Sequence, residues 1–334
     1  MTEDVSLPEA SALARTVLDR VEQAVVGKRE ALTLVLTSIL ARGHVLLEDY
    51  PGLGKTLAAR SFAQALGLHF TRAQFTPDLL PADLTGAYVY DQRSSTFEFR
   101  AGPLFTGLLL ADEINRTPPK TQSALLEAMQ EHQVTVEGTT HRLPQPFHVL
   151  ATANPVEYEG TYPLPEAQLD RFLMRVSFGY PTPDEEVDVL RRRVARRHED
   201  QELEPVTDAV GLQATHRAIE TVPIEDDIAT YCVALAAATR THPSIQVGSS
   251  PRGSLALMLT ARAYAVIDGR DFVIPEDVKA VAHAVLDHRM SIKPELWMQT
   301  DAAVGVVATA LSAVPVPPSR DASPDREVTP PPSP

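Results

Sequence analysis

A glycine-rich turn lies between an apolar run, residues 45–47, and a helical pattern that begins at Leu57. A strand, a turn ending in Gly-Lys-Thr and a helix are the context of a phosphate-binding loop. Glycines let backbone N–H groups point at phosphate oxygens, and the helix N-terminus adds partial positive charge. We expect Lys55 to reach the β- and γ-phosphates of a nucleotide, and the Thr56 hydroxyl to bind Mg²⁺. The residues predicted to contact nucleotide in this loop are Pro51, Gly52, Leu53, Gly54, Lys55, Thr56 and Leu57.

The loop departs from the pattern G-x-x-x-x-G-K-[ST] at one position, where Asp49 replaces the first glycine. Aspartate tolerates unusual backbone angles better than most residues. A carboxylate beside a triphosphate is nevertheless unfavourable, because like charges repel, unless it points away. For the motif alone, the alternative is a strand-to-helix turn that binds nothing.

Two later strands also end in polar residues. Residues 108–111 read as a buried strand followed by Asp112 and Glu113, and residues 147–153 as another, followed by Asn154. In open α/β sheets, ligands bind at these carboxyl ends of strands. We expect Asp112 to hold Mg²⁺ through water, opposite Thr56, and Glu113 to polarise the water that attacks the γ-phosphate. Asn154 is suited to donate to that phosphate or water; a solvated acidic turn and an Asn-Pro turn are the alternatives.

Four further residues are candidates for the site. Val26 and Gly27, in a break between two helical patterns, are candidates for an apolar slot that holds the nucleotide base, although an ordinary interhelix turn explains them equally well. Arg171 follows a short predicted helix, and a guanidinium there could stabilise phosphoryl transfer in a neighbouring subunit. Arg252 lies in the first turn of a helix that Ser250 caps, from where it could lean onto a bound nucleotide.

Composition narrows the class of protein. The length of 334 residues suits two domains with loose ends, and 44% hydrophobic residues suffice for real cores. No apolar run is long enough to span a membrane, and the acidic N-terminus does not resemble a signal peptide. The single cysteine, Cys232, permits no internal disulfide, which fits a reducing cytoplasm. The net charge of −14 disfavours general nucleic-acid binding, since phosphate backbones attract basic surfaces.

The hydrophobic periodicity predicts an α/β nucleotide-binding core followed by helices. Two hairpins are predicted within the core, at residues 87–99 and 134–143, the second with an acidic turn. An arginine cluster at 191–197 reads as a solvated helix end, and Trp297 and Met298 as packing for a last short helix. The predicted units are a disordered N-terminus at 1–10, a core at 11–182, a helical linker and lid at 183–312 and a disordered Pro/Ser-rich tail at 313–334.

These motifs, in this order, resemble the MoxR family of AAA+ ATPases over roughly residues 20–310. The segments that carry the resemblance are PGLGKT (51–56), FTPDLLPADLTG (75–86), LLLADEINR (108–116), ATANP (151–155), LPEAQLDRF (164–172) and SPRG (250–253). The resemblance implies an AAA+ P-loop core, a parallel sheet flanked by helices, with a small all-α lid domain. It also implies that the position of Asp49 varies in the family.

The resemblance further implies a function and its residues. ATP and Mg²⁺ would bind between core and lid, with Asn154 as first sensor, Arg252 as second sensor and Arg171 as an arginine finger for the next subunit. The protein would form a ring, usually a hexamer, and remodel or mature a protein client in the cytoplasm, in some cases for metal-cofactor insertion. Family members often work with a partner that carries a von Willebrand A domain.

Two other functions are alternatives to this one. A DNA- or RNA-dependent motor would require basic hairpin tips, and the tip at Glu137-Gly138 is acidic. An interaction module that hydrolyses nothing would not require Glu113, Asn154 and Arg171 together. The sequence therefore favours a Mg²⁺-dependent ATPase.

Overall fold

The centre of the molecule is a five-stranded parallel sheet with the strand order β2-β5-β8-β1-β9. A computed structural model describes residues 5–155, 160–197, 201–296 and 302–318. The sheet confirms the predicted α/β core. Its strands are β1 (Val45–Glu48), β2 (Phe70–Gln74), β5 (Leu108–Asp112), β8 (His148–Ala153) and β9 (Met174–Val176).

Alternate residues of the buried strands pack against helices on opposite faces of the sheet. Leu108 and Leu110 of β5 join one apolar cluster with α1, α2 and α3, whereas Leu109 and Ala111 join a second cluster with α5. This alternation follows from the two-residue period of a strand. Because helices cover both faces of the sheet, neighbouring residues of a buried strand can both be apolar, which explains the continuous apolar runs in the sequence. The core helices are α1 (Leu7–Glu22), α2 (Arg29–Leu40), α3 (Lys55–Ala65), the short α4 (Pro81–Thr85), α5 (Pro119–Glu131) and α6 (Glu166–Leu169).

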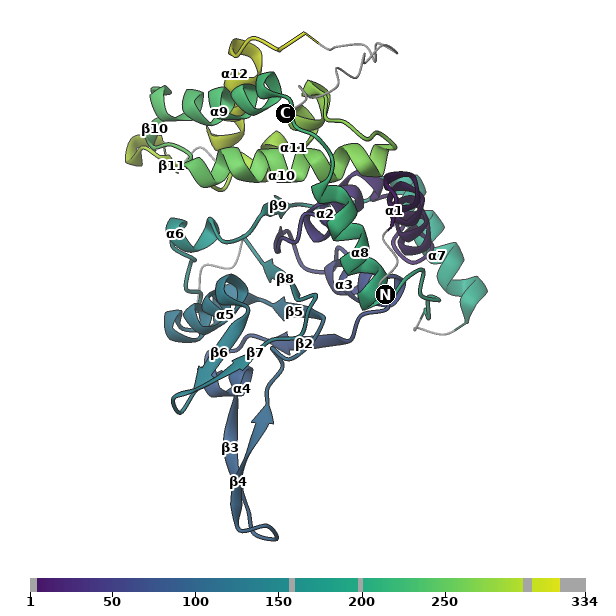
Figure 1. Cartoon of the computed structure of the whole chain (residues 1–334), viewed down its shortest axis with the longest axis vertical. Helices are drawn as coiled ribbons and strands as arrows, with labels where there is room; N and C mark the ends of the chain where they lie inside the picture. Colours follow the sequence, from purple (N-terminus) through teal and green to yellow (C-terminus); the bar gives the residue numbers. More distant parts are fainter. Residues whose placement is uncertain (1–4, 156–159, 198–200, 297–301, 319–334) are drawn as a thin grey trace, which may run out of the picture.

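A second group of helices forms the lid above the sheet (Figure 1). Helix α10 packs against both α9 and α11 and reaches down to α1 and α2 of the core. The lid also contains a short antiparallel pair, β10 (Ile245–Val247) with β11 (Ser291–Ile292), which the helical patterns did not predict. The lid helices are α9 (Asp226–Thr241), α10 (Pro251–Asp268), α11 (Pro275–Leu286) and α12 (Ala302–Ala313).

Two helices of the predicted linker and lid lie beside the core instead. Helix α8 (Ala209–Glu220) packs against α1 and α2, and the imidazole Nε2 of its His216 lies 3.0 Å from the backbone oxygen of Ile39. Helix α7 (Pro183–Arg196) reaches the end of α1, because Arg192 donates to the backbone oxygen of Glu22. Helices α7 and α8 therefore contact the core, and α8 also contacts α10 of the lid.

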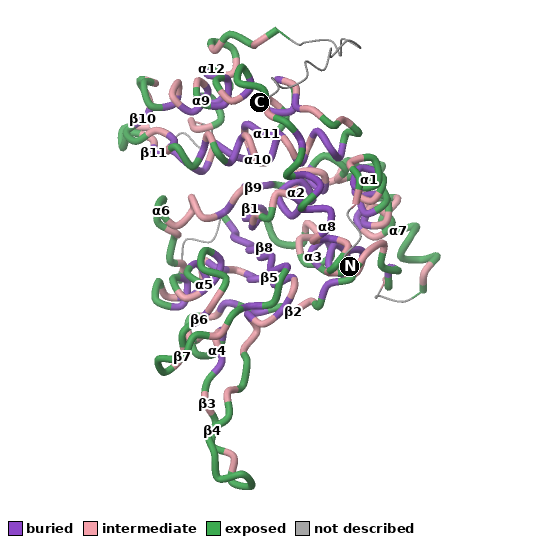
Figure 2. Tube along the Cα trace, viewed as in Figure 1, coloured by how far each residue is buried: buried purple, intermediate pink, exposed green. Residues whose placement is uncertain are grey.

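Both predicted hairpins are present. The pair β3 (Gly86–Asp91) and β4 (Thr96–Ala101) extends away from the body of the molecule and is exposed along most of its length (Figures 1 and 2). The shorter pair is β6 (Gln133–Val136) with β7 (Thr139–Arg142). The rings of Phe99 in β4 and His141 in β7 stack with centroids 3.8 Å apart, so the two hairpins are joined at their base.

The N-terminal prediction is wrong at its boundary. Helix α1 begins at Leu7, within the segment 1–10 that was expected to be disordered. Ser6 and Glu9 form a reciprocal capping box, which satisfies free N–H groups in the first turn. The S-x-x-E spacing of Ser6 and Glu9 is the sequence signal for this helix start.

Some predictions fall outside the described residues. These are the packing of Trp297 and Met298 and most of the Pro/Ser-rich tail, residues 319–334. Within the part of the chain that the structure describes, no helix combines the length and apolar character needed to cross a bilayer.

Candidate nucleotide-binding site

The glycine-rich turn connects β1 to α3, as the sequence predicted. Gly52 and Gly54 have φ values of +83° and +84°, a backbone conformation that residues with a side chain rarely adopt. A Cβ atom added at either glycine would meet no other atom within 4 Å. The loop is therefore curled tightly and leaves open space on the side where a ligand's phosphates could approach the backbone.

Lys55 is the first residue of α3, and its side chain folds back over the loop. Its ammonium donates to the backbone oxygens of Asp49 and, at 3.4 Å, of Ala153 at the end of β8. Burial lowers the pKa of Lys55, while the nearby carboxylates of Asp49 and Asp112 oppose this lowering. The Lys55 ammonium is half-buried and close to carboxylates. It is therefore placed where it can bind a triphosphate, which carries more negative charge than a carboxylate.

The carboxylate of Asp49 points away from the open side of the loop. Its Oδ2 accepts hydrogen bonds from the N–H groups of Phe178 at 2.6 Å and Gly179 at 2.8 Å, and from the Ser177 hydroxyl at 3.1 Å. Its Oδ1 accepts from the N–H of Tyr50. Asp49 thus ties the loop to the chain that leaves β9, and it is not among the residues that line the cavity over the loop.

A cavity of about 380 Å³ opens over the loop. It brings together residues from the ends of three strands, as expected from their positions at one edge of a parallel sheet. All the predicted loop residues except Leu53 line this cavity. Thr152 and Ala153 also line it, although the sequence did not predict them. The lining residues are Pro51, Gly52, Gly54, Lys55, Thr56, Leu57, Asp112, Glu113, Thr152, Ala153 and Asn154.

The carboxylate of Asp112 is held on both sides. Its Oδ1 accepts from the hydroxyl of Thr152 at 2.6 Å, and its Oδ2 accepts from two nitrogens of Arg72, at 2.9 and 2.6 Å. A carboxylate has about four acceptor positions, so one remains for a water molecule. Carboxylate and hydroxyl oxygens are the ligands that Mg²⁺ prefers, and Asp112 and Thr56 supply both in the same cavity. The residues present therefore fit a Mg²⁺ ion bound with a nucleotide.

Glu113 stands in an unusual backbone conformation, with φ of +58°. Its N–H donates to the Thr152 hydroxyl at 2.8 Å, and its Oε2 accepts from the Gln74 amide at 2.7 Å. Arg116 lies 3.2 Å from the same oxygen. A strained residue with a fixed carboxylate is typical of functional sites.

Asn154 follows β8 directly and is buried, with 8% of its surface exposed. Its backbone oxygen accepts from the side-chain amide of Asn115 at 3.3 Å. Its place at the cavity rim agrees with the position predicted from the order of strand ends.

Val26 and Gly27 do not line the cavity. Gly27 has φ of +71°, and the side chain of Glu185 at the start of α7 covers it so closely that a Cβ atom would clash. Next to it, Lys28 donates to the backbone oxygen of Tyr180, whose ring lies 5.7 Å from that of Tyr50 in the phosphate loop. The predicted base slot thus adjoins the loop through an exposed pair of tyrosines that sequence reasoning missed.

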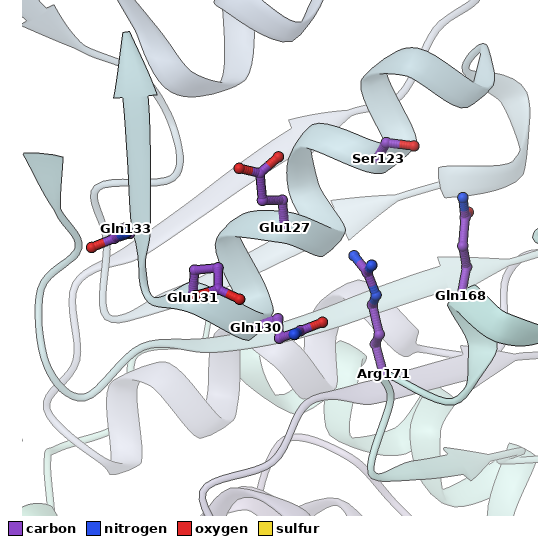
Figure 3. Close-up of a pocket in the computed structure, with 7 residues that line it drawn as sticks. All are labelled: Ser123, Glu127, Gln130, Glu131, Gln133, Gln168 and Arg171. Carbon is purple, nitrogen blue, oxygen red and sulfur yellow. The ribbon is translucent and has the colours of Figure 1, made fainter. Parts of the chain in front are cut away.

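The two predicted arginines also lie outside this cavity. Arg171 follows α6 and extends toward α5 (Figure 3), where it lines a separate polar cavity of about 550 Å³ with Glu127 and Glu131. Arg252 is 61% exposed, and its guanidinium lies 3.8 Å from the carboxylate of Asp170. Neither arginine therefore lines the cavity over the phosphate loop of the same chain.

Sequence reasoning missed three residues that hold the acids in place, Arg72, Gln74 and Thr152. Arg72 and Gln74 belong to β2, which pairs directly with β5, and Gln74 lies opposite Asp112 in the register. Thr152 lies in β8, the other neighbour of β5. A signal was available, because polar residues near the ends of strands adjacent to Asp112 must face the same edge of the sheet.

Comparison with known proteins agrees with this geometry. Residues 44–174 match the family model described as "ATPase family associated with various cellular activities (AAA)", and residues 237–305 match an AAA lid domain. The protein YeaC of Bacillus subtilis is 50% identical over 91% of this chain and 95% of its own. Chaperone MoxR1 of Mycobacterium tuberculosis is 41% identical over 84% of this chain and 76% of its own.

The fold has the same support from a solved structure. A crystal structure of a candidate ATPase from Cytophaga hutchinsonii superimposes with a TM-score of 0.85 at 40% identity, covering 93% of this chain and 98% of the other. The sheet, the lid and the phosphate loop described above are therefore those of a known family. The chain belongs to the MoxR family of AAA+ ATPases.

Proposed function

We propose that this protein hydrolyses ATP with Mg²⁺ in an oligomeric ring and uses the turnover to remodel a protein client. The single observation that carries the proposal is the cavity that joins the phosphate loop to Asp112, Glu113 and Asn154. A phosphate-binding turn alone would only bind. Two acids and an amide at the same cavity supply what hydrolysis also requires.

In this proposal the loop and α3 bind the triphosphate. The backbone N–H groups around Gly52 and Gly54 and the helix N-terminus hold its oxygens, and Lys55 exchanges its contacts with backbone oxygens for the β- and γ-phosphates. The Thr56 hydroxyl would hold Mg²⁺, and Asp112 would hold it through water. The ion, when bound, neutralises charge on the phosphates during cleavage.

Glu113 acts as the group that orients the attacking water, and Asn154 as a donor to the γ-phosphate or to that water. The hydrogen bond from Gln74 and the nearby Arg116 hold the Glu113 carboxylate in one orientation. Because Glu113 and Asn154 end neighbouring strands, a ligand at the loop meets both.

The arginines complete the site in two ways. Arg171 lies beside a cavity on the α5–α6 side of its own subunit, which supports a role at the site of an adjacent copy. Such a guanidinium stabilises the charge of phosphoryl transfer in trans. Arg252 is exposed and loosely paired, so it can turn from Asp170 toward a nucleotide held below the lid. A ring, hexameric as in the family expectation, follows if each site needs its neighbour's arginine.

The client is proposed to be a protein. The long β3–β4 hairpin exposes Val89, Tyr90 and Phe97, with the last two 50% and 68% exposed. Apolar side chains on a projecting ribbon are suited to contact unfolded or partly folded chains, and the name of the relative MoxR1 describes a chaperone. A partner with a von Willebrand A domain remains part of the proposal from family resemblance alone.

The decisive experiment compares ATP binding and turnover in the wild-type protein and in Glu113→Gln. We expect Glu113→Gln to bind ATP in the presence of Mg²⁺ with an affinity similar to that of the wild type and to release no phosphate. Absence of Mg²⁺-dependent ATP binding by the wild type would refute the proposal. Normal turnover in Glu113→Gln would reject Glu113 as the water-orienting residue.

A further inference from the structure

The lid forms hydrogen bonds with the short segment of the core that contains Arg171. Arg289, which follows α11, has a side chain only 2% exposed, and its Nε donates to Asp170 at 2.9 Å. Its Nη2 donates to the backbone oxygen of Phe172 at 2.7 Å, and its Nη1 to that of Leu173 at 3.1 Å. One lid guanidinium therefore binds the residues immediately before and after Arg171.

Beyond Arg171 the core also holds this segment, because Phe172 is buried in the apolar cluster that includes α5, and the N–H of Leu173 donates to the backbone oxygen of His44 at 2.8 Å. Helix α6 spans only four residues and is one turn long, so Arg171 does not stand on a long rigid helix. A second lid contact lies close by, because the Ser291 hydroxyl in β11 donates to the carboxylate of Glu166 at the start of α6. Both ends of the segment are thus bound to the lid.

Asp170 also lies close to a second arginine of the lid, Arg252. Its Oδ1 accepts from Arg289 at 2.9 Å, while its Oδ2 lies 3.8 Å from Arg252. The first pair is short and buried, so breaking it leaves a charge without its partner. The second is long and exposed, and pairs of that kind contribute little. Arg252 can leave Asp170 without disturbing Arg289.

We propose that Arg289 is a positioning residue for Arg171, so that the lid of one subunit sets the place of the arginine delivered to the next subunit's nucleotide. The proposal rests on the proposed trans role of Arg171. When the lid moves over its own nucleotide, Arg289 transmits that movement to Asp170, the residue directly before Arg171. The occupancy of one site then governs hydrolysis at the adjacent one, through a rigid contact.

A purely structural role for Arg289 predicts a different pattern, so the test depends on whose site is affected. The variants are Arg289→Lys, which keeps the charge but loses the forked geometry, and Asp170→Asn, which keeps the size of the side chain. Each is measured for ATP turnover alone and mixed with Glu113→Gln subunits, which have inactive sites and intact arginines. Arg171→Ala is the reference.

We expect both variants to lower kcat between about tenfold and a hundredfold, with KM changed less than about threefold, because a displacement near 1 Å of a catalytic group has effects of this size. Mixing with Glu113→Gln should restore turnover at the variants' own sites, as it should for Arg171→Ala. The matched control is Arg270→Lys, because Arg270 pairs with the buried Asp277 inside the lid, away from α6. Arg270→Lys should lower the midpoint of urea unfolding. Mixing it with Glu113→Gln subunits should not raise its ATP turnover.

Three results would overturn the proposal. Full activity in Arg289→Lys and Asp170→Asn would show that the contact does not position anything. Reduced activity without recovery on mixing, while Arg171→Ala does recover, would show that Arg289 acts within its own subunit. Failure of Arg171→Ala itself to recover would refute the trans role of Arg171, and this proposal with it. If Arg289→Lys does not fold, Asp170→Asn carries the same comparison.

Discussion

The carboxylate of Asp49 accepts a 2.6 Å hydrogen bond from the backbone N–H of Phe178, across 129 positions of sequence. This contact explains how the phosphate loop accommodates an acid where the common pattern has glycine. The loop and the strand end that follows the Arg171 segment are thereby joined. The residue that looked least compatible with phosphate binding instead anchors the loop.

Replacing Asp49 tests this anchoring role. We expect Asp49→Gly, which restores the common pattern, to lower the free energy of unfolding by about 2–3 kcal/mol, because buried N–H groups lose a charged acceptor. Affinity for ATP should change less than about tenfold, or 1.4 kcal/mol, since the carboxylate points away from the cavity. Urea unfolding and ATP titration measure the two. Asp49→Asn, which keeps an acceptor oxygen, should lose less stability; a large gain in affinity in Asp49→Gly would contradict the assignment.

Thr152 links the two acids, and its hydroxyl can be removed without changing its shape. It donates to Asp112 and accepts from the N–H of Glu113 at the end of β5. Thr152→Val should cost about 1–3 kcal/mol of stability, because it leaves that buried N–H without an acceptor. It should also lower kcat by about tenfold or more through misplacement of Glu113. Thr152→Ser retains the hydroxyl and should behave nearly as the wild type, and wild-type turnover in Thr152→Val would show that the link is dispensable.

The trans role of Arg171 predicts an effect that depends on assembly. In homogeneous rings, Arg171→Ala should bind ATP normally but lose about a thousandfold or more in turnover, the usual contribution of a guanidinium to phosphoryl transfer. Arg171→Lys should recover only part of this, because lysine lacks the planar fork. Mixing Arg171→Ala with Lys55→Ala subunits should restore some phosphate release. No recovery at any ratio would place the arginine elsewhere.

The exposed aromatics of the β3–β4 hairpin predict a separable loss of client binding. Tyr90 and Phe97 lie opposite one another in the hairpin, with ring centroids 5.3 Å apart. Changing both to serine should leave the unfolding free energy within about 1 kcal/mol, since the site is on the surface. Proteins captured from a lysate by Glu113→Gln in the presence of ATP should be lost when the two serines are added. If DNA or RNA stimulated the wild-type ATPase instead, a nucleic-acid motor would become the better description.

Because three histidines are buried, we expect the protein to lose stability in mild acid. Burial lowers the pKa of His44 to about 3, of His148 to about 4 and of His216 to about 3. In the unfolded chain these imidazoles take up protons below about pH 6.5, whereas in the folded protein they stay neutral until much lower pH. Stability is therefore complete above about pH 6.5 and falls as the pH is lowered, by roughly 2 kcal/mol per histidine at pH 5.

Urea unfolding at several pH values measures this dependence. The matched variant is His216→Gln, which retains a side-chain donor near the backbone oxygen of Ile39 and cannot titrate. Its unfolding free energy should decline less steeply with acid than that of the wild type. Equal slopes would show that His216 remains solvated enough to be protonated in the folded state.

The local elements of the nucleotide site could be predicted from sequence because each is contiguous. An apolar run followed by Gly-Leu-Gly-Lys-Thr has one strand–turn–helix solution, and Asp112, Glu113 and Asn154 directly follow apolar runs that a parallel sheet must bury. The parallel arrangement then brings their ends to one edge. The same reasoning placed both hairpins and most helices, although it missed the capping box at Ser6.

Contacts between distant segments were decided only by the tertiary structure. Nothing near Asp49 in sequence indicates that Phe178 will supply its hydrogen bonds, and nothing near Asp170 indicates Arg289, 119 positions later. The same is true of Arg72 and Thr152, which face Asp112 because the strands β2 and β8 flank β5. Hydrophobic periodicity states which face of an element is buried, but the partner of a buried polar group depends on how complete elements pack against one another.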